Sequence, residues 1–303
     1  MLEIENFSGV IVVARDGQPP AIRTTGPWTP DTPFQIASVS KNFAATLALM
    51  LVEDGLLDLH EPVTRWLPEA QEGISLHHLL SNTSGIGHWQ DVPGMDPETP
   101  ATRDERLALV VRAPLLSEPG TEFRYSSPAF LLASVVAERA AGRPYTELLS
   151  EKVIEPLGLT ATGSGVAPVG VAPGHHAGTP VEPWDLRSMI GSGDLFSTAT
   201  DLVAYAHALH DGNLVSPASL ALMRTRHIAF PEPERTPDGR HSIAGYGYGH
   251  YVGTFDGRPA VLHTGDNPGY KSLLGWFPDG VVVVALSNDD AVQWEDVLPH
   301  LLS

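Results

Sequence analysis

Residues 34–41 read Phe34-Gln35-Ile36-Ala37-Ser38-Val39-Ser40-Lys41, and an alanine- and leucine-rich run follows them. Ser38 and Lys41 stand three positions apart, so in the first turn of a helix they share a face and the hydroxyl can meet the amine. A serine hydroxyl is a weak nucleophile until a neighbouring base takes its proton. A lysine shielded from water can be that base, because desolvation favours the neutral amine. The motif is short, and it also fits a capping serine followed by a solvated lysine.

The composition is that of a large, acidic chain without cysteine. Its 303 residues are 42% hydrophobic, which suits one large domain or two closely packed ones. The 18 basic and 36 acidic side chains give a formal charge of −18, which argues against nucleic acid and anionic membranes as partners. The absence of cysteine excludes disulfides, thiolate zinc sites and a cysteine nucleophile. We expect neither a metal nor a cofactor.

The N-terminal residues predict a cytoplasmic protein without a membrane span. Residues 1–5 are acidic and lack the apolar core of a signal peptide. The apolar run at 9–14 is too short to cross a bilayer. A signal peptide that had already been removed would leave no trace in this sequence.

The first part of the chain predicts a β-hairpin followed by the helix that carries Lys41. Residues 9–15 are apolar and β-branched, Asp16-Gly17 is a turn signal, and residues 21–24 complete the hairpin. From Lys41 onward, apolar residues recur at helical spacing until Gly55, which has the position of a C-terminal capping glycine.

The middle of the chain, residues 60–200, predicts short helices separated by loops. A helix should begin at Ser127-Pro128, with serine as the cap and proline in the first turn, and end at Ala141. Long loops in a compact domain are often functional. Two such loops, rich in glycine and proline, are expected at about 84–101 and 161–192. One more helix is expected at about 199–211.

The C-terminal part predicts an antiparallel meander with turn residues between its strands. A closing helix at about 291–302 should be interrupted by Pro299. The predicted strands are residues 246–254, 259–263, 270–276 and 281–287.

Strands at both chain ends with helices between them predict an α/β fold of the α+β type. One antiparallel sheet is built from both ends of the chain and flanked by helices, and a mostly helical part is inserted. We therefore expect a single unit over residues 1–303. Its α/β subdomain covers about 1–59 and 201–303, and its helical subdomain covers about 60–200.

Two further stretches carry residues suited to chemistry. Tyr125-Ser126-Ser127 stands at a loop-to-helix junction, where the phenol can face a cleft; a lysine neighbour would lower the tyrosine pKa and let it relay protons. The alternative is a packed tyrosine beside a capping serine. His263-Thr264-Gly265-Asp266 ends a predicted strand, and its alternative is a strand end with a turn glycine.

Taken in order, Ser38-x-x-Lys41, Tyr125-x-x and His263-Thr264-Gly265 resemble the three motifs of the serine β-lactamase and penicillin-binding-protein superfamily. The resemblance is closest to the class C β-lactamase-like branch, which also holds esterases, D-amino-acid-acting peptidases and acyltransferases. It covers about residues 8–290 and implies a β-lactamase/transpeptidase-like fold. The flanking stretches that agree with it are residues 79–85, 156–160, 193–202 and 269–274.

The resemblance implies that Ser38 attacks an acyl carbonyl and that Lys41 and Tyr125 share the role of base. His263, from the third motif, is the fourth expected catalytic residue. The oxyanion hole would consist of the backbone N–H groups of Ser38 and Asp266, and such donors usually make a large catalytic contribution.

Two departures from the family pattern bear on substrate choice. Ser127 stands where asparagine is common, and a hydroxyl reaches a substrate amide less well than a carboxamide does. His263 replaces lysine, so that a substrate carboxylate meets a mostly neutral imidazole. Asp266 adds a negative charge beside the expected oxyanion hole. These changes favour esters over β-lactams and peptides. Thr264 and Gly265 complete the expected substrate-binding residues of this strand.

The remaining candidates are weaker. Trp89 and Trp184 sit in the two long loops, where they could line the pocket or simply pack over the core. The paired and loop histidines show no metalloprotease spacing, and ordinary surface or loop positions explain them better. These histidines are His77-His78, His88, His175-His176, His207 and His210.

We therefore expect a serine hydrolase that acts on small esters or amides. Three alternatives stay open: an acyltransferase that passes the acyl group to an amine or alcohol, a β-lactamase or D,D-peptidase, and a non-catalytic binding protein on the same scaffold. The expected partner is a small ester, amide or β-lactam-like molecule, and the oligomeric state is open.

Overall fold

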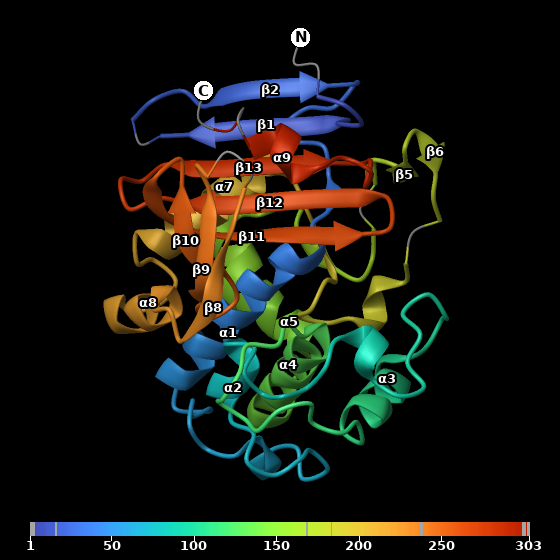
Figure 1. Ribbon diagram of the computed structural model, residues 1–303, viewed down its shortest axis with the longest axis vertical. Helices are drawn as coiled ribbons and strands as arrows, with labels where there is room; N and C mark the ends of the chain where they lie inside the picture. The colour runs from blue at the N-terminus through green and yellow to red at the C-terminus, as the bar shows by residue number, and fades with distance from the viewer. Residues whose placement is uncertain are drawn as a thin grey trace.

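An eight-stranded antiparallel sheet is assembled from two distant parts of the chain (Figure 1). The computed structural model describes residues 4–15, 17–167, 169–182, 184–236, 239–298 and 301. In spatial order the strands are β2-β1-β13-β12-β11-β10-β9-β8, so the N-terminal hairpin pairs directly with the last strand. The bounds are β1 Gly9–Ala14, β2 Ala21–Thr25, β8 Ile228–Arg235, β9 Ser242–Tyr246, β10 Tyr251–Phe255, β11 Arg258–Asn267, β12 Tyr270–Trp276 and β13 Val282–Ser287.

The central strands are apolar throughout because both faces of the sheet are covered. Every residue of β1 and β13 is buried. Val10 and Val12 pack toward the helical side, whereas Ile11 and Val13 pack in a second cluster on the opposite face. The helix α7 lies on the first face and α9 on the second (Figure 1). Alternation along each strand thus supplies both layers of the core.

The helices occupy mainly the middle of the chain, and α1, α2, α4 and α5 lie below the sheet in the view of Figure 1. Their bounds are α1 Ser40–Glu53, α2 Leu76–Leu80, α3 Arg103–Val110, α4 Ser127–Ala141, α5 Tyr145–Leu149, α6 Glu155–Leu157, α7 Ala199–His210, α8 Pro217–Arg224 and α9 Trp294–Val297. Short 3₁₀ turns are η1 Ala37–Val39, η2 Val63–Arg65, η3 Trp89–Asp91 and η5 Leu186–Ser188, and η4 Ser150–Ile154 is π-helical.

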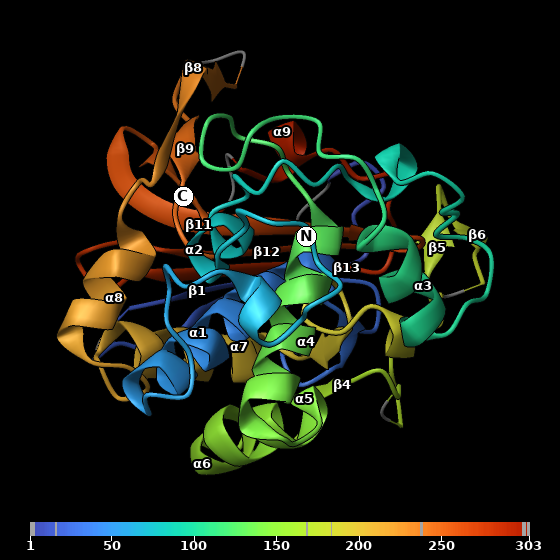
Figure 2. The same ribbon diagram turned by 90° about the horizontal axis from the view of Figure 1, so that it is seen from below.

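Small strands connect the loops to the helix that carries the nucleophile. β3 Phe34–Gln35 leads into η1 and α1, and it pairs with β7 Leu195–Ser197, which also pairs with β4 Gly163–Ser164. A separate two-stranded ribbon consists of β5 His175–His176 and β6 Thr179–Pro180. Figure 2, seen from below, shows α1 and α4 packed together beneath the strands.

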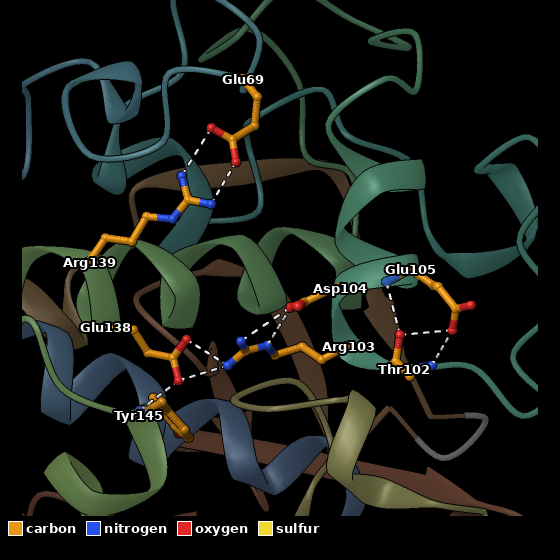
Figure 3. A network of polar contacts seen from close by, with 8 residues as sticks. All are labelled: Glu69, Thr102, Arg103, Asp104, Glu105, Glu138, Arg139 and Tyr145. Carbon is orange, nitrogen blue, oxygen red and sulfur yellow. Dashed lines mark hydrogen bonds and ion pairs between the residues drawn. The ribbon is translucent and has the colours of Figure 1, made fainter.

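Ion pairs fasten the helical part on its outer side (Figure 3). Arg139 of α4 makes two hydrogen bonds to Glu69, at 2.6 and 2.9 Å, and Arg103 of α3 makes two to Glu138, at 2.7 and 2.9 Å. The Thr102 hydroxyl accepts the Glu105 N–H at the start of α3. These contacts hold α3 and the loop that contains Glu69 on α4, and an exposed pair such as Arg139–Glu69 contributes about 0–1 kcal/mol.

The fold class expected from the sequence is confirmed, and so are the N-terminal hairpin and the helices that follow Lys41 and Ser127. The Asp16 half of the predicted hairpin turn lies outside the described residues. The helix predicted at about 199–211 is α7, which Thr198 caps by accepting the Asp201 N–H. The division into two subdomains stays a prediction.

Several expected boundaries are wrong. Residues 246–254 are not one strand, because β9 ends at Tyr246 and the chain turns through Gly247 and Gly249 before β10. The two strands β8 and β9 were not expected. The predicted closing helix at 291–302 is reduced to four residues, and residues 299, 300 and 302 lie outside the described part. In the described part of the chain, no helix is both long enough and apolar enough to cross a bilayer.

Candidate active site

The nucleophile candidate Ser38 sits in a turn with an unusual backbone. Ala37, directly before it, has a φ of +46°, a region that a residue with a side chain rarely adopts. Ser38 then lies in η1, and the regular helix α1 begins only at Ser40. Such strained positions persist where the surrounding structure fixes them, and they cluster at functional sites.

Lys41 is fully buried, and its amine lies 2.8 Å from Ser38 Oγ. The same Nζ donates to Ser192 O at 2.6 Å and lies 3.0 Å from Ser127 Oγ. Burial holds the pKa of Lys41 well below its usual value, and the carboxylate of Asp194 acts in the opposite direction. A neutral amine at this place can accept the Ser38 proton.

Tyr125 lies beside this pair. Lys41 Nζ is 5.0 Å from the centre of the Tyr125 ring. Burial raises the pKa of Tyr125 above its usual value, and hydrogen bonds to Ser38 and Ser127 only partly oppose this. The expectation of a lowered tyrosine pKa is therefore wrong: because the phenol is desolvated, its neutral form is favoured. A neutral phenol can still relay a proton by giving one and taking another.

The serine that caps α4 is one residue earlier than expected. Ser126, not Ser127, caps α4, because its hydroxyl accepts the Ala129 N–H at 3.0 Å. The Ser126 N–H in turn donates to Asn82 Oδ1 at 3.0 Å. Ser127 is thereby left free to direct its hydroxyl toward Lys41 Nζ.

The third motif packs directly against the Ser38 turn. A methyl group added at Gly265 of β11 would lie 2.4 Å from Ile36 O and 3.0 Å from Ala37 Cβ. Ser272 Oγ of β12 donates to Ile36 O at 2.6 Å. The absence of a side chain at Gly265 thus lets the backbone of β11 approach the residue before Ser38. Thr264 is half-buried at the same strand.

The His263 side chain is buried, and its imidazole is neutral. Nδ1 donates to Thr264 O at 2.5 Å, and Nε2 accepts from the Tyr246 hydroxyl at 2.9 Å. Burial, and secondarily the nearby Lys41, holds the pKa of His263 well below its usual value. Both ring nitrogens are engaged, so in this arrangement the imidazole offers neither a charge nor a free nitrogen.

Asp266 is not an isolated negative charge. Its carboxylate accepts a hydrogen bond from Lys271 Nζ of β12 at 2.7 Å. The expected repulsion of anionic substrates by Asp266 is therefore largely offset by its partner.

The two tryptophans differ. Trp89 is buried in the main core, with the Arg106 guanidinium 5.9 Å from its ring, so the packing interpretation holds for it. Trp184 is half-buried and lines a cavity of about 440 Å³. The cavity is formed by residues of both long loops, by Arg106 of α3 and by Pro268 just after β11; the loop residues are 97–101, Val181, Glu182, Trp184, Asp185 and Ser188.

His88 was missed as a site residue. Its Nδ1 accepts the Ser127 N–H at 3.2 Å, and its ring meets Tyr125 edge-on at 5.4 Å. Burial, with a contribution from Lys41, lowers its pKa to about 4, so the ring is neutral near pH 7. Ser192 was missed as well. Neither stands in a pattern that marks it, since each reaches the site only through the fold.

No three histidine or carboxylate side chains gather as a metal-binding group anywhere in the described ranges. Two of the other histidines singled out in the sequence make hydrogen bonds away from Ser38. His77 Nδ1 lies 2.7 Å from the Tyr248 hydroxyl, and His210 Nδ1 accepts from Arg224.

A buried Ser-x-x-Lys pair at the head of a helix, with tyrosine and an apposed glycine-containing strand, defines a class of serine acyl-enzyme hydrolases. A family model described as Beta-lactamase matches residues 4–299, and the chain belongs to this family.

Individual relatives agree with that assignment. Esterase EstB of Burkholderia gladioli is 30% identical and aligns over 92% of this chain and 85% of its own length. Penicillin-binding protein 4* of Bacillus subtilis (strain 168) is 26% identical over 95% of this chain and 69% of its own. The solved structure of D-amino acid amidase from Ochrobactrum anthropi SV3 superposes with a TM-score of 0.84 at 26% identity, covering 98% and 94% of the two chains.

Proposed function

We propose that the protein hydrolyses small carboxylic esters or amides through an acyl-enzyme on Ser38. The observation that carries the proposal is the distance of 2.8 Å between Ser38 Oγ and the amine of a fully buried lysine. Desolvation favours the neutral form of that amine, which is the form that a general base requires.

The proposed reaction has two halves. Lys41 takes the Ser38 proton while Oγ bonds to the substrate carbonyl carbon, and the negative oxygen is held by the backbone N–H groups of Ser38 and Asp266. Lys41, with Tyr125 as relay, returns the proton to the leaving alcohol or amine as its bond to carbon breaks. Water then attacks the acyl-Ser38 ester by the same proton path, which releases the acid and restores the hydroxyl.

The surroundings of Ser38 favour small neutral substrates over penicillins. Ser127 uses its hydroxyl on Lys41 instead of presenting a carboxamide, and His263 is uncharged with both nitrogens occupied. A substrate carboxylate would therefore meet an uncharged imidazole at His263 instead of a cation. The names of two relatives, an esterase and an amidase, support the same substrate classes. Lys271, paired with Asp266, makes the charge argument weaker than the sequence alone implied.

The test is intact-protein mass spectrometry after exposure to a fluorophosphonate probe. We expect one adduct in the unmodified protein and none in Ser38→Ala. Ser40→Ala is the matched control. The Ser40 hydroxyl accepts the Leu195 N–H at 3.1 Å and should not react with the probe, so this variant should still take one adduct. A protein that takes no label would support a non-catalytic binding role.

Product analysis separates hydrolysis from acyl transfer. With p-nitrophenyl butyrate and an added primary alcohol, we expect butyrate as the main product. A predominance of the butyrate ester of the added alcohol would favour an acyltransferase. A cytoplasmic location stays a prediction.

A further inference from the structure

One buried carboxylate close to the Ser38–Lys41 pair has no part in the chemistry described so far. Asp194 is completely inaccessible to solvent. Its Oδ1 accepts the Gly191 N–H at 2.8 Å, and its Oδ2 accepts the Ser164 hydroxyl. A fully buried carboxylate is costly to keep charged.

Asp194 belongs to a segment that is hydrogen-bonded to neighbouring parts of the fold at each residue from 192 to 195. The Asp194 side chain closes the turn from Gly191, so it fixes the carbonyl that Lys41 uses. The contacts are Lys41 Nζ to Ser192 O (2.6 Å), Asn267 Nδ2 to Gly193 O (3.3 Å), Gly165 N to Asp194 O (2.9 Å) and Leu195 N to Ser40 Oγ (3.1 Å).

The other titratable groups around Lys41 are neutral near pH 7. Burial raises the pKa of Tyr125, lowers that of His88 to about 4 and lowers that of His263. Within the described residues, Asp194 is the carboxylate whose charge acts on the Lys41 pKa.

Tyr145 of α5 is neutral as well. Burial, with the Asp194 charge as a further cause, raises the pKa of that phenol well above its usual value. Hydrogen bonds from Ser164 and from the backbone favour the charged form of Asp194, and a proton on Lys41 favours it further.

We propose that Asp194 is a positioning residue for the reaction at Ser38: its carboxylate holds Ser192 O against Lys41 and stabilises the ammonium that forms when Lys41 takes the serine proton. The inference rests on the proposed function, since it assigns a partner to the same base. Opposite charges interact more strongly in a desolvated site than in water. The ammonium exists only while the proton is on Lys41, so the stabilisation acts on the acylation step more than on substrate binding.

Lys41 and Asp194 form a coupled pair, and the active form is the one in which the pair has lost its last proton. The acid limb of the pH profile of kcat/KM therefore gives the apparent pKa at which the pair loses its last proton. Removing the carboxylate charge lets Lys41 lose its proton at lower pH. Removing a hydrogen-bond donor destabilises the charged carboxylate and raises its pKa. The pair therefore keeps its last proton up to a higher pH.

The experiment compares two variants whose limbs should move in opposite directions. In Asp194→Asn we expect the acid limb of p-nitrophenyl butyrate hydrolysis to move down by about one pH unit, the plateau to fall at least about tenfold and KM to change less than about threefold. In Ser164→Ala, which keeps the charge, we expect the limb to move up. Unshifted limbs, or limbs that move the same way, would overturn the inference. If Asp194→Asn does not fold, the upward shift in Ser164→Ala still decides.

Asp201→Asn is the matched control. Asp201 is also buried and also accepts one backbone N–H and one hydroxyl, from Ala161 at 3.0 Å and Thr162 at 2.8 Å. Its replacement should leave the acid limb unshifted, and a shift equal to that of Asp194→Asn would show a purely structural effect. Labelling of the unmodified protein at Ser38 separates this inference from the proposed function: without labelling the proposed function fails, whereas labelling with unshifted limbs defeats only the role of Asp194.

Discussion

At the scale of single residues, the site depends on desolvation. Burial lowers the pKa of the Lys41 amine and raises the pKa of the Tyr125 phenol, so it favours the uncharged form of both groups. The pair therefore starts with the amine ready to accept a proton and the phenol ready to donate one. His263, which replaces the usual lysine, is neutral and adds no further charge.

We predict that Lys41→Ala and Tyr125→Phe each lower the acylation rate by about 10²–10⁴-fold, as loss of a general base or relay does. The double variant should be no more than about tenfold worse than the poorer single variant, because residues of one proton path are not additive. Stopped-flow acylation with p-nitrophenyl butyrate measures this. Fully additive losses would mean that the two residues serve separate steps.

Sequence spacing predicts some residues of the site but not others. Ser38 and Lys41 are three residues apart, so helical geometry alone brings them together. Ser192 and Asp194 lie about 150 residues beyond Lys41, and no local rule links them. His88 was placed among ordinary loop histidines, since only the fold brings its ring onto Tyr125.

At the scale of elements, the site requires β11 to lie directly against η1. Gly265 is the contact point, and its missing side chain sets how close the strand can come. The short strands β3 and β7 hold η1 from the other side. Ser38 is thus fixed between β11 and the segment that carries Ser192.

We predict that Gly265→Ala lowers kcat/KM by at least about 100-fold, because a displacement of about 1 Å at the reacting groups can cost that much. The added methyl must push apart backbone atoms, which also lowers the free energy of unfolding by about 1–3 kcal/mol. Gly163→Ala on β4 is the control, since a methyl there meets nothing within 4 Å. Equal activity in the two variants would contradict the close-approach argument.

The elements that sequence reasoning missed have physical reasons. β8 is an edge strand, largely exposed, and contains Pro231 and Pro233, which lack ladder donors and hide the strand pattern. The chain bends between Gly247 and His250, where Gly249 has a φ of +73°, although the alternating tyrosines predicted a continuous strand. By contrast, the buried strands β1 and β13 are uninterrupted apolar runs and were predictable.

At the scale of the whole molecule, Asp194 links the site to stability. Burial raises its pKa from 3.8 to about 6. A carboxyl group whose pKa is higher in the folded than in the unfolded protein contributes stability at low pH, and this contribution is lost as the pH rises through about 4 to 6.

We predict that Asp194→Asn removes this loss. Between about pH 4 and pH 6.5, the free energy of unfolding of the variant should rise relative to the unmodified protein, by up to roughly 3 kcal/mol. Urea denaturation of both proteins across that range measures the difference, in which the carboxylates common to both cancel. A difference that does not vary with pH would contradict the assigned pKa direction.

We predict that the whole molecule prefers neutral short-chain esters to penicillin-like compounds. The chain has a net charge of −18, and the third motif offers a neutral histidine. The kcat/KM values for p-nitrophenyl butyrate and for nitrocefin should differ in favour of the ester by more than tenfold, about 1.4 kcal/mol in transition-state binding. A tenfold preference for nitrocefin would instead identify a β-lactamase.

Peptide mapping after rapid quenching with p-nitrophenyl butyrate would detect the acyl group on Ser38 directly. We expect a butyryl group on the peptide that contains Ser38 and loss of turnover by several powers of ten in Ser38→Ala, with the fold retained by circular dichroism. A butyryl group on Ser40 or on no residue, or near-normal turnover in Ser38→Ala, would contradict the account.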